Sequence, residues 1–160
     1  MQDPLQPRRL AWIETFRCRS RLDLLPRWHR SGDHEQRPVL AEPWGAVPRP
    51  DWAERGLLIW PRGGVWLEIE QVIRWPSHWL RSEDSQERLV LSWWADEVRV
   101  WVDDELVHSG DLFETRCRWV LPKRWRSGSG LRVRLELRSP CHDDGALISS
   151  TLIKEPRNPQ

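Results

Sequence analysis

The 160-residue chain has few of the residues that mark several classes of protein. Its three cysteines, Cys18, Cys117 and Cys141, are widely spaced and form no Cys-x-x-Cys pair. This excludes a disulfide scaffold or a zinc knuckle and favours reduced thiols. No stretch reaches the ~20 apolar residues of a membrane span, and no apolar run follows residues 1–9 as in a signal peptide. We therefore expect a cytoplasmic protein with no membrane partner.

Blocks of one charge are also missing from the chain. The 25 basic and 24 acidic residues give a formal net charge of +1 and are interspersed. Recognition of nucleic acid needs a concentrated basic face, so we expect no nucleic-acid partner. The length suits one domain, since typical domains have ~100–150 residues.

Residues 88–121 carry the clearest structural pattern. Val98, Val100 and Val102 alternate with polar or charged neighbours, and this period of two is typical of a half-buried strand. Asp103-Asp104 interrupts the alternation, and aspartate tolerates the left-handed backbone of a tight turn. The pattern therefore predicts an antiparallel hairpin.

The alternation extends over most of the chain and predicts an all-β fold, an antiparallel β-sandwich or jelly roll. The expected strands cover residues 57–61, 65–74, 88–95, 97–103, 105–109, 115–121, 130–138 and 146–154. We expect residues 57–155 to form the core of the sandwich and residues 156–160 to form a tail.

The first 56 residues have a different pattern. The spacing of apolar residues predicts a short helix over 7–19, and residues 20–30 predict a strand that Pro26 places at a sheet edge. Residues 31–56 are rich in proline and tryptophan and predict a long loop. Such loops are usually functional or pinned to a neighbour. We expect this segment to pack on the sandwich.

Thirteen tryptophans and no tyrosine make the aromatic composition unusual. Strand alternation places Trp93 and Trp119 in the core. It places Trp66 among glutamates, and Trp101 beside Arg99, on charged faces. An exposed indole can stack on a sugar ring or mark a docking surface for another domain. The alternative is that the 31–56 loop or a further domain covers both indoles.

A second candidate lies at His142-Asp143-Asp144-Gly145, the densest group of His and Asp residues. These residues could contact a sugar hydroxyl or Ca²⁺, although Ca²⁺ takes six to eight oxygen ligands. The alternative is a turn between strands, in which Gly145 supplies a positive φ and the aspartates bond backbone amides. Asp96, Asp103, Asp104 and Asp111 gather near one hairpin, but nothing there predicts a catalytic cleft.

Several segments together resemble a known family. They are Trp60-Pro61, Trp66-Leu67, Trp93-Trp94-Ala95-Asp96, the hairpin Val102–Val107, Gly110-Asp111-Leu112-Phe113, Leu131–Leu135 and Ser139–Leu147. Over residues 57–155 the chain resembles the N-terminal β-sandwich of class II α-mannosidases, glycoside hydrolase family 38, of the bacterial and especially cyanobacterial type. One departure is Asp103-Asp104, where the family commonly has Asn-Gly.

The resemblance implies a galactose-binding-domain-like sandwich that packs beside a glycosidase domain or shapes its cleft, without catalysis of its own. The family's zinc ligands and nucleophilic aspartate lie downstream of this module, so we expect no cofactor in this chain. Two alternatives remain open. One is an independent lectin-like module that binds carbohydrate, and the other is a structural or protein-interaction remnant of a split α-mannosidase gene.

Overall fold

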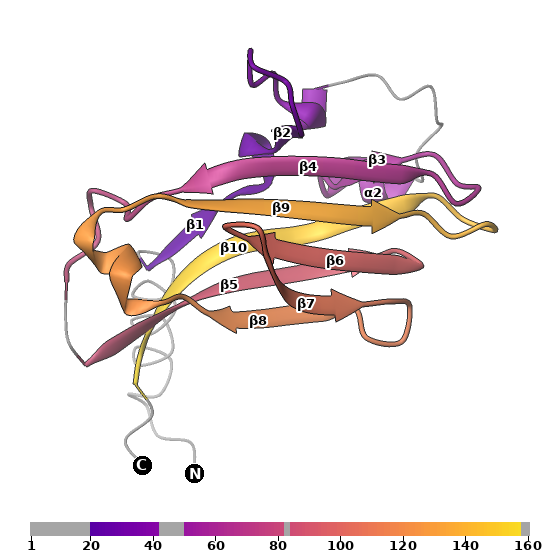
Figure 1. The fold of residues 1–160 in the computed structure, drawn as a ribbon. Helices are drawn as coiled ribbons and strands as arrows, with labels where there is room; N and C mark the ends of the chain where they lie inside the picture. The colour runs from indigo at the N-terminus through magenta and orange to yellow at the C-terminus, as the bar shows by residue number, and fades with distance from the viewer. Residues whose placement is uncertain (1–19, 42–49, 82–83, 158–160) are drawn as a thin grey trace, which may run out of the picture.

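The computed structural model describes residues 20–41, 50–81 and 84–157 as two antiparallel sheets packed face to face (Figure 1). Sheet A has the order β1 (Arg21–Asp23), β10 (Gly145–Pro156), β5 (Ser85–Trp94) and β8 (Arg116–Val120), with β3 (Leu58–Trp60) also paired to β10. Sheet B has the order β2 (His29–Arg30), β4 (Trp66–Ile73), β9 (Leu131–Arg138), β6 (Glu97–Val102) and β7 (Glu105–Gly110). The predicted all-β sandwich is confirmed.

The eight strands expected between residues 57 and 154 are all present. Their ends differ little from the prediction, and the largest difference is β5, which begins at Ser85 rather than at residue 88. The hairpin between β6 and β7 also forms as expected. Asp103 and Asp104 have φ angles of 48° and 66°, so both adopt the left-handed backbone of a type I′ turn.

Alternating side chains fill the space between the sheets. Leu89 and Leu91 of β5 and Leu135 and Leu137 of β9 are completely buried, while their neighbours along each strand face outward. Trp93 is 1% exposed, as predicted for a core residue. Trp119 is only half-buried and packs against the edge of the same core, so strand parity placed it correctly but overestimated its burial.

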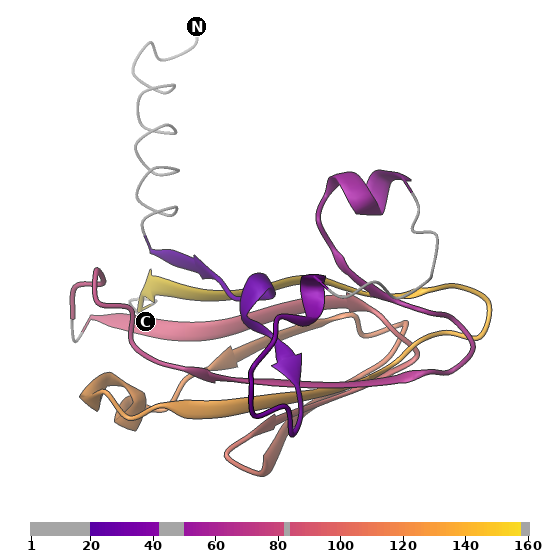
Figure 2. The same ribbon diagram turned by 90° about the horizontal axis from the view of Figure 1, so that it is seen from above.

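The strand predicted over residues 20–30 is two short strands in different sheets. β1 pairs with β10 in sheet A, and β2 pairs with β4 in sheet B. Pro26 lies between them in the 3-10 helix η1 (Leu25–Arg27), where its missing N–H breaks no sheet hydrogen bond. Both strands lie at sheet edges, as the proline predicts. Viewed from above, the segment crosses from one layer to the other (Figure 2).

The described helices are all short. They comprise η1, η2 (Val39–Ala41), α2 (Pro50–Glu54) and η3 (Lys123–Ser127), and none of them is both long and apolar enough to cross a membrane. The prediction that residues 31–56 form only a loop is therefore wrong at η2 and α2. Trp52 of α2 packs with Ala146 and Trp94 on the outer face of sheet A, which pins this segment to the sandwich. The helix predicted over 7–19 lies outside the described residues.

Candidate binding surface

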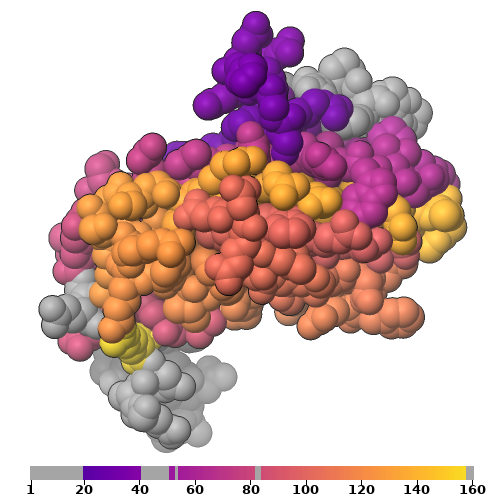
Figure 3. Space-filling view, viewed as in Figure 1, coloured from indigo at the N-terminus to yellow at the C-terminus, as the bar shows by residue number. Residues whose placement is uncertain are grey.

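The outer face of sheet B, toward the viewer in Figure 3, collects charged and aromatic side chains from three neighbouring strands. In the strand register, Trp66 lies opposite Arg138, which lies opposite Glu97, and Trp101 lies opposite Arg134. We call this surface the tryptophan–arginine face. It comprises Trp66 of β4, Glu97, Arg99 and Trp101 of β6, and Arg134, Glu136 and Arg138 of β9.

Ion pairs link most of the charged groups on this face to one another. The N···O distances are 2.7 Å for Arg99–Glu97, 3.5 Å for Arg99–Glu136, 3.0 Å for Arg134–Glu136, 3.4 Å for Arg138–Glu97 and 2.6 Å for Arg138–Asp96. Each pair is partly exposed, so each contributes little to stability by itself. Their joint effect is to neutralise the face locally and to hold the arginine side chains in place.

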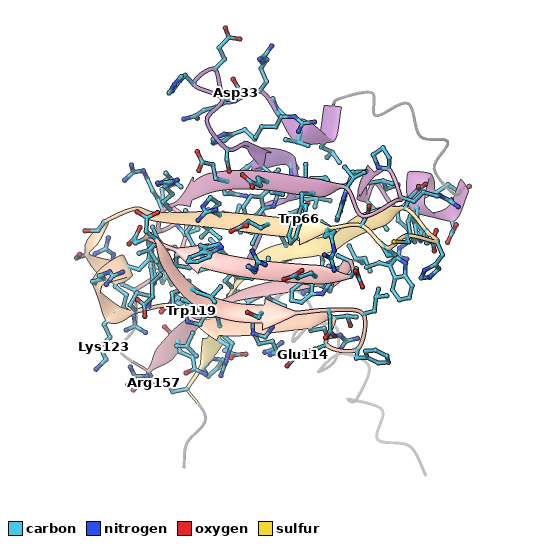
Figure 4. All side chains as sticks on the ribbon, turned by 45° about the vertical axis from the view of Figure 1, so that its right-hand side comes forward. Asp33, Trp66, Glu114, Trp119, Lys123 and Arg157 are labelled. Carbon is cyan, nitrogen blue, oxygen red and sulfur yellow. The ribbon has the colours of Figure 1, made fainter. Side chains whose placement is uncertain are left out.

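Trp66 is the exposed aromatic residue of the face. It is 39% exposed, and its ring lies near two guanidinium groups. The Cζ atoms of Arg99 and Arg138 are 5.3 and 5.5 Å from the ring centroid, within the range of cation–π attraction. Figure 4 shows Trp66 lying over the sheet. The arginines thus hold a large apolar ring at the surface.

Trp101 differs from Trp66 in its exposure, although strand alternation in the sequence predicts an outward-facing side chain for both. The Cζ atom of Arg134 is 5.0 Å from its ring centroid, and the residue is half-buried. Its Nε1 is shielded from solvent and has no hydrogen-bond partner among the described residues. Of the two indoles predicted to be exposed, only Trp66 therefore is. Arg99, which the sequence placed beside Trp101, lies close to Trp66.

The turn at His142–Gly145, which joins β9 to β10, is hydrogen-bonded to the connection between β3 and β4. Asp144 Oδ1 accepts hydrogen bonds from the backbone N (3.0 Å) and the Nε (3.2 Å) of Arg62, which follows β3. Asp143 Oδ1 accepts the backbone N–H of Asp144 at 3.0 Å, and both aspartates are 7% exposed. His142 is exposed. The carboxylates of this turn thus bond to the turn and to Arg62, and they do not extend the tryptophan–arginine face.

Gly145 has a different role from the one predicted. A positive φ occurs at five other described glycines, and Gly145 is not among them. A Cβ atom at this position would instead lie 2.5 Å from the indole of Trp60. The interpretation of Gly145 as a positive-φ turn residue is therefore wrong, because the glycine is needed for close packing against Trp60.

The aspartates near the β6–β7 hairpin are also bonded within the fold. Asp103 accepts the backbone N–H of Arg132 at 3.0 Å, and Asp96 pairs with Arg138. Asp111 Oδ1 accepts two backbone N–H groups of its own loop. Over residues 20–41, 50–81 and 84–157, no three His, Cys, Asp or Glu side chains gather as a metal site requires.

Three members of the tryptophan–arginine face, all on β9, were not predicted from the sequence. Arg134, Glu136 and Arg138 alternate with the buried residues Val133, Leu135 and Leu137, so their common outward face was visible in the sequence. The pairing of β9 between β4 and β6 was not visible. That pairing makes β9 the centre of the face and brings its charges between Trp66 and Arg99.

Comparison with known proteins shows a structural likeness only. No protein-family model matches the chain, and no curated protein matches it. Among solved structures, the chain is similar to an FMN-binding beta-glucuronidase from Facaelibacterium prausnitzii L2-6, with a TM-score of 0.54 and 14% sequence identity. The match covers 85% of this chain but only 22% of the glucuronidase chain. At this identity the likeness establishes the β-sandwich fold alone.

Proposed function

We propose that this chain is a non-catalytic accessory β-sandwich of a glycosidase, resembling the N-terminal domain of family 38 α-mannosidases, and that it contacts the glycosidase domain through the tryptophan–arginine face. Two observations of different kinds support the proposal. One is the sequence resemblance over residues 57–155. The other is that a protein named as a beta-glucuronidase has this fold in a part that is 22% of its length.

The exposed indole of Trp66 is the observation that carries the proposal. Leaving apolar surface in water is unfavourable by about 25 cal/mol per Å², so a partner that covers Trp66 gains this burial. The surrounding charges already pair with one another, and a partner therefore needs no large opposite charge. A neutral surface with one rigid aromatic residue suits docking of a neighbouring domain.

A lectin-like function is the second candidate, and Glu68 favours it. This residue follows Trp66 on the outward side of β4, is exposed, and forms no ion pair with the described residues. Indole rings stack on pyranose rings, and a free carboxylate accepts hydrogen bonds from sugar hydroxyls. Trp66 and Glu68 would then form a single carbohydrate subsite.

Two binding measurements on the wild-type chain and on Trp66→Ala separate these functions. In the first, the chain is mixed with a separately expressed family 38 catalytic domain that lacks its own N-terminal sandwich. We expect association, and we expect Trp66→Ala to weaken it about tenfold or more. In the second, mannose oligosaccharides are titrated while tryptophan fluorescence is followed, and we expect no shift.

The matched control is Leu80→Ala, which removes an 81% exposed apolar side chain from the connection between β4 and β5. It should leave domain association unchanged. A fluorescence shift with mannosides that is lost in Trp66→Ala, without domain association, would establish the lectin-like function instead. Absence of both effects would show that the tryptophan–arginine face is not a contact surface.

A further inference from the structure

Strand β8 forms an open edge of sheet A. Within the part of the chain that the structure describes, it pairs only with β5. The backbone of Thr115 accepts from Trp93 N at 3.0 Å, and Leu121 N donates to Glu87 O at 2.9 Å. Because bonding alternates along an antiparallel strand, the N–H and C=O groups of the even-numbered residues 116, 118 and 120 do not bond the backbone of β5. Of these groups, the Arg118 C=O accepts a long hydrogen bond of 3.5 Å from the Arg88 side chain. Such an edge can pair with another strand.

The two ends of β8 carry opposite charges. Asp111 and Glu114 lie in the loop before the strand, and Lys123 and Arg124 follow it. Glu114 and Lys123 form no ion pair with the described residues. Figure 4 shows these two side chains at opposite ends of β8. Arg124 is already paired with Asp103 at 3.1 Å, and Arg116 begins the strand close to Glu114. The charge complementarity with an antiparallel copy therefore rests on Glu114 at one end of the strand and Lys123 at the other.

The acidic end also presents an aromatic side chain. Phe113 is 100% exposed, although its loop is well anchored. Asp111 Oδ1 accepts the backbone N–H groups of Phe113 and Glu114 at 2.8 and 2.9 Å, and Asp111 O accepts the Nε1–H of Trp93 at 3.2 Å. At the other end of the strand, Val120 is 43% exposed. Apolar surface is thus available at both ends.

We propose that β8 pairs antiparallel with β8 of a second copy of this chain, which joins the two A sheets about a two-fold axis. The axis reverses the strand, so the acidic end of each copy meets the basic end of the other. Glu114 then lies near Lys123 of the second copy, and Phe113 covers its apolar Val120 end. Every contact occurs twice, as in an isologous dimer.

This association is independent of the proposed function, because it uses sheet A and leaves the tryptophan–arginine face of sheet B free. The competing interpretation is that Arg116 and Arg118 protect the edge from pairing, as charged residues do on many edge strands. That interpretation predicts a monomer at every concentration.

Analytical ultracentrifugation of the 160-residue chain over a wide concentration range tests the pairing. We expect a reversible monomer–dimer equilibrium in the wild type. Arg118→Pro removes an N–H that points away from β5, so it should abolish the dimer while leaving the pairing with β5 intact. Arg118→Ala is the matched control, because it removes the same side chain, keeps the N–H and should still dimerise.

Side-chain variants test the contacts at the ends of the strand. Phe113→Ser should weaken dimerisation about tenfold or more, as expected for an exposed aromatic anchor. Glu114→Lys should also weaken it, and adding Lys123→Glu in the same chain should restore it. A monomeric wild type would overturn the proposal. A dimer that survives in Arg118→Pro with an unchanged dissociation constant would also overturn it, since association would then use another surface.

Discussion

The interior of the sandwich and the tryptophan–arginine face contain the same chemical groups in different arrangements. In the interior, four fully buried tryptophans each donate a hydrogen bond from Nε1 to another part of the chain. The pairs are Trp28 with Ser150 Oγ (2.8 Å), Trp60 with Val65 O (2.9 Å), Trp93 with Asp111 O (3.2 Å) and Trp125 with Ile73 O (3.0 Å). Each indole therefore fills space and also joins two segments.

On the tryptophan–arginine face, a guanidinium group takes the place of this hydrogen bond. Trp66 is positioned by Arg99 and Arg138, and its surface remains partly open to solvent. Ion pairs show the same contrast. The Glu87 carboxylate is 3% exposed and lies 3.1 Å from Arg126 Nε, whereas the side chains of Arg99 and Glu97 are 39% and 34% exposed. The interior thus uses these groups for stability, and the face leaves them available for contact.

The largest expected effect on the free energy of unfolding is that of truncating a buried tryptophan. We expect Trp93→Ala to lower the free energy of unfolding by about 3–5 kcal/mol, because it leaves a cavity and removes the bond to Asp111. Trp66→Ala should lower it by about 1 kcal/mol or less, since the side chain is exposed and loses only cation–π contacts. Denaturant unfolding of both variants measures the difference. Equal losses would contradict the distinction between interior and face.

The two ion pairs should differ in the same direction. Glu87→Gln removes the charge of a carboxylate that pairs with Arg126 at 3.1 Å while itself only 3% exposed, and it should cost about 3 kcal/mol. Glu97→Gln breaks pairs on the exposed face and should cost about 1 kcal/mol or less. Thermal or urea unfolding of the two variants at neutral pH provides the test. A loss for Glu97→Gln as large as that for Glu87→Gln would show that the face is a structural network.

The smallest expected effect concerns the two described thiols, the buried Cys117 and the exposed Cys141. Burial, and then the charge of Glu114, raise the pKa of Cys117 from 9.0 to about 11. Between these values the unfolded chain loses the thiol proton while the folded chain keeps it, so stability falls as pH rises.

We expect a loss of about 2 kcal/mol from this thiol between pH 8.5 and pH 11. The chain has no tyrosine, so few other groups titrate in this range. Urea unfolding at several pH values should show a shallower decline in Cys117→Ala than in the wild type or in Cys141→Ala. If the free energy of unfolding fell equally with rising pH in all three proteins, groups other than Cys117 would cause the loss of stability.

Much of the fold follows from local patterns. A period of two identified every strand between residues 57 and 154, and Asp103-Asp104 identified the hairpin, because strand alternation and turn backbone depend on neighbouring residues. Pro26 correctly indicated a sheet edge for the same reason. The division of residues 20–30 between two sheets was not predicted, since it depends on the distant strands β4 and β10.

The candidate surface was predictable only in part. Alternation placed Trp66, Arg99 and Trp101 on outward faces, and the structure brings them onto one face. The inward-facing Glu87 did not stand out, because its partner Arg126 is distant in the sequence. Gly145 was misinterpreted, since its neighbour Trp60 is brought close only by the pairing of β3 with β10.

The sequence by itself determined which residues form strands and which side of each strand a residue occupies, because both follow from the geometry of adjacent residues. The tertiary structure decided what covers each side. Trp66 and Trp101 have equivalent positions in the sequence pattern, yet one is exposed and the other half-buried. Exposure depends on the strands and side chains that pack nearby, and long-range pairing alone brings these together.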